Sequence, residues 1–128
     1  MRLTQSERKA IFDQALGANK SFGVDWNFDA EDVAFNIKQV VPHLDINGVR
    51  PKQINGDWIE IVTIEGKDYQ FNLDSEIKPL EIVGKANLHL KSTGQTFVLF
   101  DSKDDEYCFI LISLSELPEY LEKGFIEI

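Results

Sequence analysis

The sequence predicts an α+β fold in which two N-terminal helices pack on an antiparallel sheet of about five to six strands, with a short C-terminal helix. Two observations predict it. Apolar residues recur at helical intervals up to residue 41, and they alternate with polar residues from Trp58 onward. Helices followed by a run of strands are typical of an α+β layout. The 128 residues, 43% of them hydrophobic, are expected to form a single domain, 1–128.

Two helices are predicted in the first third of the chain. Thr4 and Glu7 have the spacing of a capping box, apolar residues follow at helical intervals, and Gly17 provides a stop. Asp29 is suited to cap a second helix, because acidic residues follow in its first turn. This helix should end just before Pro42.

The connections around the second helix are less regular. Residues 18–28 fit neither period, and their aromatic residues Phe22, Trp26 and Phe28 are expected to pack inward, with a ligand contact as the alternative. After the helix the tripeptide Ile-Asn-Gly occurs twice, ending at Gly48 and Gly56. Both copies predict tight turns with positive φ, so this stretch should be a double-turn connection to the sheet.

Two sets of strands are expected in the second half of the chain. Trp58–Ile64 and Tyr69–Leu73 should form a hairpin through a turn at Gly66. The second set comprises residues 86–91, 96–100 and 107–114. Residues 107–112 are apolar on both faces, which predicts a central strand. A short helix should begin after Ser115 as its N-cap and end near Gly124, and residues 125–128 could close the sheet as an edge strand.

Composition narrows the classes of partner. The formal charge of -9 argues against nucleic acid and anionic membranes as direct partners and favours a basic protein. The N-terminus has no apolar signal region, and the single cysteine, Cys108, lies in an apolar run where a buried thiol is expected. These features predict a cytoplasmic protein without disulfides.

No residue pattern predicts catalysis, a metal site or a cofactor. His43 and His89 lack the spacing of a zinc site, and the acidic turn 101–106 lacks that of a calcium loop. Phosphate-binding loops and nucleophile elbows are also absent from the sequence. The chain is therefore not expected to be an enzyme, although His89 could act as a general base if the fold placed a carboxylate beside it.

Negative charge is concentrated at the C-terminal end, where residues 101–128 hold eight acidic and two basic residues. Acidic surfaces with aromatic anchors steer and hold basic proteins, although an acidic surface also simply keeps a protein in solution. The residues expected to contact a partner are Asp101, Asp104, Asp105, Glu106, Glu116, Glu119 and Tyr120.

In its size, acidity, α+β layout and lack of catalytic motifs, the chain resembles the immunity proteins that accompany bacterial polymorphic and contact-dependent growth inhibition toxins. The resemblance implies an inhibitor that occludes a cognate toxin, possibly a basic nuclease, through carboxylate contacts to Lys and Arg side chains.

Two alternatives remain open. One is a small-molecule-binding module with an apolar pocket lined by Trp26, Trp58, Phe97 and Phe100. The other is a small hydrolase or isomerase that pairs His89 with a carboxylate.

Overall fold

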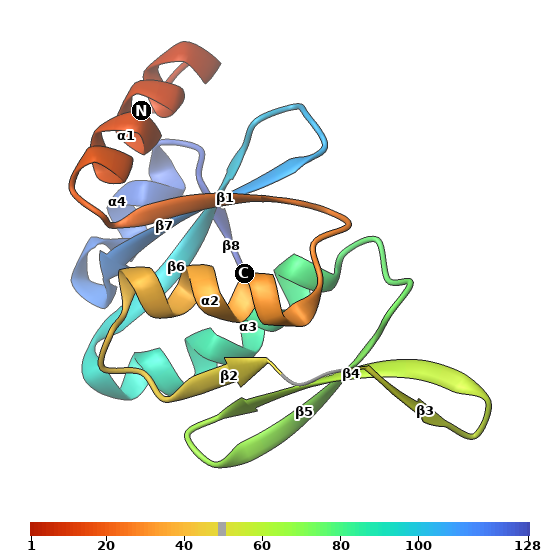
Figure 1. The fold of residues 1–128 in the computed structure, drawn as a ribbon. Coiled ribbons are helices and arrows are strands. Elements are labelled where there is room, and N and C mark those ends of the chain that lie inside the picture. Colours follow the sequence, from red (N-terminus) through yellow and green to blue (C-terminus); the bar gives the residue numbers. More distant parts are fainter. Residues whose placement is uncertain (49–50) are drawn as a thin grey trace.

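The computed structural model describes residues 1–48 and 51–128, and it arranges them as alternating layers of helices and sheets (Figure 1). Helices and strands follow each other in the order α1 (Gln5–Gly17), β1 (Ser21–Asp25), α2 (Ala30–Val40), β2 (Ile46–Gly48), β3 (Lys52–Ile54), β4 (Asp57–Ile64), β5 (Lys67–Asn72), α3 (Lys78–Leu90), β6 (Gln95–Asp101), β7 (Glu106–Ser113), α4 (Leu117–Glu122) and β8 (Ile126–Glu127). Short 3₁₀ turns precede β6 and α4. No helix in the described part of the chain is long and apolar enough to cross a membrane.

The strands form two antiparallel sheets, not one. Sheet A has the order β1-β7-β6-β8, so β7 is central, as its two apolar faces predict. In sheet B, β2 and β3 pair with successive parts of the same edge of β4, and β5 pairs with its other edge. The expectation of a single sheet of five to six strands was therefore wrong, although the α+β class and the antiparallel pairing are confirmed.

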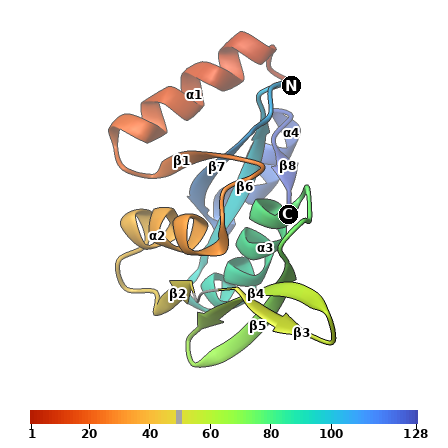
Figure 2. The ribbon, with the colours of Figure 1, turned by 45° about the vertical axis from the view of Figure 1, so that its right-hand side comes forward.

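The layers follow from the alternation of side chains along sheet A. One face, which carries Phe100 and Ile110, packs against α1 and α4. The opposite face, which carries Phe97 and Phe109, packs against α2 and α3. Sheet B covers the far side of α2 and α3 with residues such as Val62 (Figure 2). The two N-terminal helices thus lie on opposite faces of sheet A and do not share one face.

The predicted helix starts are confirmed. Thr4 and Glu7 form the complete capping box of α1, because Glu7 N–H donates to Thr4 Oγ1 (3.2 Å) and Thr4 N–H donates to the Glu7 carboxylate (2.9 Å). Asp29 caps α2 by accepting a hydrogen bond from Asp32 N–H (2.9 Å). The helix α2 ends at Val40, before Pro42.

Residues 86–91 were wrongly predicted as a strand, since they lie at the end of α3 and in the turn after it. The alternation of Leu88, His89 and Leu90 is local. The wider period is helical, with buried residues at Pro79, Ile82, Val83, Ala86, Asn87 and Leu90. Gly84 obscured this period because glycine is unfavourable within helices.

Strand β1 was missed because it is short, contains Gly23 and pairs with residues far away in the chain. Phe22 is buried in the core and Phe28 packs against it, as expected for the aromatics of this segment. Trp26 does not pack inward in this way, since 43% of its surface is exposed.

The two Ile-Asn-Gly copies differ in structure. Asn55 and Gly56 have positive φ (53° and 87°) and form the predicted turn between β3 and β4. Asn47 and Gly48 instead lie in strand β2, so the double-turn prediction was wrong for the first copy. A Cβ atom at Gly48 would lie 2.3 Å from Glu31 Cα, which shows that this glycine permits close packing of β2 against α2.

At the C-terminus, the cap of the last helical segment is Ser113 and not Ser115. Ser113 and Glu116 form a capping box around a 3₁₀ turn, and α4 starts only at Leu117. Gly124 follows with a φ of 103°, and β8 then pairs with β6 as the predicted edge strand.

Candidate functional site

The residues predicted to contact a partner lie at two separate places. Asp104 and Glu106 stand at the start of β7, whereas Glu116 and Tyr120 follow its end. The eight residues of β7 span roughly 23 Å at the usual rise per residue, so the two groups do not form one continuous acidic surface.

The first group lines a groove of about 390 Å³ where three connections meet. These are the turn after β1, the connection from β5 to α3, and the β6–β7 hairpin. We call it the acidic groove, and its lining residues are Trp26, Glu76, Ile77, Asp104, Asp105, Glu106 and Tyr107. Trp26 and Ile77 are 43% and 50% exposed, so apolar surface lies beside the carboxylates.

Two hydrogen bonds join the connections that form the acidic groove. Trp26 N–H donates to Asp105 O (3.2 Å), which continues the β1–β7 ladder beyond β1. The Tyr107 hydroxyl donates to Glu76 O (3.2 Å). Burial and the nearby Glu76 carboxylate raise the pKa of Tyr107, so its hydroxyl remains a donor at neutral pH.

A buried ion pair anchors two of these connections from inside the protein. Lys78 Nζ donates to the Glu60 carboxylate, and Glu60 Oε2 accepts a hydrogen bond from Ala30 N–H (2.8 Å) at the start of α2. Lys78 Nζ also donates to Leu73 O (3.3 Å). The ion pair therefore holds the first residue of α2, which follows the turn that contains Trp26, and the first residue of α3, which directly follows Ile77.

The acidic residues of the β6–β7 hairpin differ in whether their side chains already contact another residue of the protein. Asp101 pairs with Lys103 (2.9 Å), whose hydrogen bonds lower the pKa of Asp101. The side chain of Glu106 folds over Gly23, where a Cβ atom would lie 2.0 Å from Glu106 Oε1. Among the described residues, Asp104 and Asp105 make no salt bridge.

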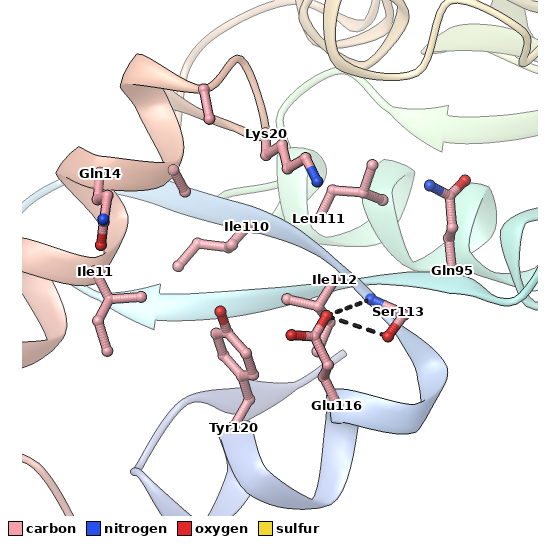
Figure 3. Close-up of a pocket in the computed structure, with 12 residues that line it drawn as sticks. Ile11, Gln14, Lys20, Gln95, Ile110, Leu111, Ile112, Ser113, Glu116 and Tyr120 are labelled. Atoms are coloured by element: carbon pink, nitrogen blue, oxygen red, sulfur yellow. Dashed lines mark hydrogen bonds between the residues drawn. The ribbon is translucent and has the colours of Figure 1, made fainter.

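The second group lies beside a groove of about 370 Å³ between α1, β7 and α4 (Figure 3). Glu116 accepts hydrogen bonds from the Ser113 N–H and hydroxyl (both 3.1 Å), and Glu119 pairs with Lys123 (3.0 Å). Tyr120 points its hydroxyl toward this groove, and burial raises its pKa. Glu116 and Glu119 therefore support local structure in this region.

His89 is half-buried on α3 and does not lie on a strand as predicted. Its Nε2 is 2.8 Å from the Tyr69 hydroxyl. A cleft of about 400 Å³ is lined by both histidines, His43 and His89, together with Glu65. In the residues the structure describes, no group of three His, Cys, Asp or Glu side chains is placed to hold a metal ion.

The four aromatic residues of the predicted apolar pocket do not meet. Phe97 and Phe100 are buried on opposite faces of sheet A, in different parts of the core. Trp58, in sheet B, is 51% exposed. A pocket with this lining is thus not formed.

Sequence reasoning missed Glu76 and Ile77 of the acidic groove and the buried pair Glu60–Lys78. Glu60 occupies the same strand face as Val62 and Ile64, so a charged residue at an apolar position was the available signal. Glu76 and Ile77 carried no comparable signal, because only the fold brings them beside the β6–β7 hairpin.

The fold and its grooves define a layered α+β protein with an acidic, partly apolar groove formed by loops. The chain belongs to the family described as a domain of unknown function, DUF6630, whose model matches residues 6–124. No curated protein and no solved structure matches it.

Proposed function

We propose that this protein is a cytosolic immunity protein, which binds a basic toxin domain through the acidic groove and blocks it. The observation that carries the proposal is the convergence of Glu76, Asp104 and Asp105 with the exposed ring of Trp26 in one groove. We therefore assign the partner site to the hairpin end of β7 and not to the region of Glu116, Glu119 and Tyr120.

Charge supports a basic partner. Among the residues that the structure describes, no Lys or Arg lines the acidic groove, and Lys103 in the adjoining hairpin is paired with Asp101. The groove therefore presents a field of one sign, which raises association rates with a cation-bearing surface by about 10- to 1,000-fold at low salt. Carboxylates of this kind can accept hydrogen bonds from the Lys and Arg side chains of a toxin.

The exposed apolar residues support a protein as the partner more than a free ion. Trp26 offers a large surface and a ring face that can stack on a guanidinium group. Tryptophan is among the residues that contribute most to protein interfaces, and Ile77 adds apolar area at the same place.

The supporting contacts indicate that the groove is formed before binding. Its connections are joined by the Trp26–Asp105 and Tyr107–Glu76 hydrogen bonds and anchored by Glu60 and Lys78. A preformed site loses less conformational entropy on association.

The proposal predicts that the adjacent upstream reading frame encodes a toxin-like C-terminal domain, and it is tested by co-expression with that domain. The wild-type protein should restore growth, and the double variant Asp104→Lys/Asp105→Lys should not. The matched control, Asp57→Lys/Glu127→Lys, changes two exposed acidic residues elsewhere by the same charge and should still protect. Equal protection by both double variants would refute the proposal, provided both fold.

A second candidate function is a small hydrolase or isomerase, favoured by the Tyr69–His89 contact and by a cleft that His89 lines together with His43 and Glu65. A histidine hydrogen-bonded to a phenol can act as a general base. Hydrolysis of p-nitrophenyl acetate should then fall at least tenfold in His89→Gln and little in His43→Gln. Equal rates in the wild type and His89→Gln would exclude this activity for that ester.

A further inference from the structure

We propose that the free edge of β1 binds an extended, Lys- or Arg-bearing segment of the partner as an additional strand of sheet A. The inference rests on the proposed function, because that function supplies a basic partner. It adds a main-chain docking site to the side-chain contacts of the acidic groove.

The register of β1 against β7 determines which of its main-chain groups face outward. Lys20 O accepts a hydrogen bond from Leu111 N–H (2.7 Å), and Trp26 N–H donates to Asp105 O (3.2 Å). Main-chain groups alternate in direction along an antiparallel pair. The even-numbered residues between these two points therefore bond to β7, and the odd-numbered residues face away.

Ser21 and Gly23 present main-chain N–H and C=O groups to this free edge. Among the described residues, no hydrogen bond reaches these groups. Gly23 is half-buried and lines the neighbouring groove, whereas Ser21 is only 3% exposed, so Gly23 offers the more accessible pair of main-chain groups. An added strand would supply the missing donors and acceptors.

The edge forms one side of a groove of about 480 Å³ between α1 and α2. Leu16 from α1 and Asn36 and Gln39 from α2 line it together with Ser21 and Gly23. Figure 1 shows β1 at the front of the molecule, with α1 above and α2 below it. The groove thus gives an extended chain both main-chain partners and side walls.

The edges formed by β8 with β6, by β3 and by β5 carry features that discourage pairing. Strand β8 is two residues long, and beyond it the Asn87 side chain bonds both main-chain groups of Phe97 in β6 (2.7 and 3.1 Å). Pro51 precedes β3, and β5 begins with two charged residues, Lys67 and Asp68. Strand β1 has five residues and only its last, Asp25, is charged, and unprotected edges readily accept a further strand.

Charge favours a basic segment over a second copy of this chain. Two chains of formal charge -9 repel each other, and Glu106 lines the β1 groove. At the Ser21 end, Asn19 Nδ2 donates to Gln39 O (2.9 Å) and ties the segment after α1 to α2. The other end of β1, at Asp25, leads to Trp26 and the acidic groove.

The test uses a six-residue peptide of alternating threonine and lysine, at millimolar concentration, with NMR detection of amide hydrogen exchange. Addition of the peptide should slow exchange at Ser21 and Gly23 at least tenfold. A peptide with glutamate in place of lysine controls for charge. The second control is the lysine peptide N-methylated at every internal amide, which keeps its charge but cannot pair as a strand. Neither the glutamate peptide nor the N-methylated peptide should slow amide exchange at Ser21 and Gly23.

The outcomes separate this inference from the proposed function. If the lysine peptide shifts the Trp26 indole resonance but leaves exchange at Ser21 and Gly23 unchanged, strand addition is refuted while the acidic groove still binds cations. Equal protection by the N-methylated peptide would also refute strand addition. If amide exchange at Ser21 and Gly23 is already slow without peptide, and slows further as protein concentration rises, a second copy of this chain occupies the edge and the proposal is overturned.

Discussion

Lys78 and Glu60 form an ion pair inside the protein, where their side chains are 3% and 1% exposed. Because Glu60 also accepts the Ala30 N–H, this contact joins sheet B to the first residues of both α2 and α3. The same two residues thereby position two of the three connections that form the acidic groove.

Replacement of Lys78 by Met should lower the free energy of unfolding by about 3–5 kcal/mol, because Glu60 would remain buried without its partner. Chemical denaturation measures the change. Lys9→Met is the control, since the Lys9–Asp13 pair is exposed and should contribute little to stability. A loss below about 1 kcal/mol in Lys78→Met would contradict the role given to the buried pair.

Asn87→Ala should cost about 2–4 kcal/mol, because both the N–H and the C=O of Phe97 would lose their side-chain partner in a buried position. Thermal or chemical unfolding provides the measurement. Asn72→Ala serves as the control, since Asn72 is exposed and its replacement should change stability by less than about 0.5 kcal/mol. Equal effects of the two substitutions would show that the Asn87 amide does not close the β6 edge.

Gly48→Ala should destabilise the protein by about 1–3 kcal/mol, because the new methyl group would overlap the main chain of Glu31. In Gly17→Ala the same change places a methyl group where no atom lies within 4 Å, near the end of α1. That control should be neutral or slightly stabilising. Unchanged stability in Gly48→Ala would mean that β2 and α2 can separate at little cost.

Cys108 should resist alkylation in the native protein. Burial, followed by the nearby Glu106 carboxylate, raises its pKa to about 12, so the reactive thiolate is scarce up to at least pH 9. In denaturant the pKa returns to about 8.5, which increases the thiolate fraction at pH 8 by about a thousandfold. Iodoacetamide labelling followed by mass spectrometry compares the two rates. Native labelling within tenfold of the denatured rate would contradict this assignment.

The raised pKa of Cys108 also sets the direction of a pH effect on stability. The folded state holds this proton more tightly than the unfolded state, so stability should fall as pH rises above about 8.5 toward 12. Cys108→Ala, which lacks the titrating group, should show a weaker decline over that window. An identical pH dependence in both proteins would exclude Cys108 as a contributor.

Local signals in the sequence were sufficient for several elements. The capping box at Thr4, the Asp29 cap and the apolar run of β7 each depend on neighbours within a few residues, and each prediction is confirmed. The β4–β5 hairpin follows from its turn, where Glu65 and Gly66 both have positive φ.

The errors concern pairings between distant residues. Strand β1 is defined by its register with β7, in which Phe22 lies opposite Phe109. The helical period of α3 appears only over its whole length, beyond the short alternation around His89. The acidic groove depends on the same distant contacts. The sequence indicated the acidic character of the hairpin with Asp104 and Asp105, but it could not place Trp26 and Glu76 beside them.

The central claim, that the acidic groove holds a basic protein, is tested most directly by stopped-flow association with the toxin domain that the proposal predicts in the upstream reading frame. The Trp58→Phe background leaves Trp26 as the only tryptophan, so its fluorescence reports on the groove itself. In that background Asp104→Lys/Asp105→Lys should slow association by at least about tenfold and flatten its salt dependence. Asp57→Lys/Glu127→Lys should change the association rate and its salt dependence much less. Equal rates and salt dependences for the two variants, or no change in Trp26 emission on binding, would contradict the account.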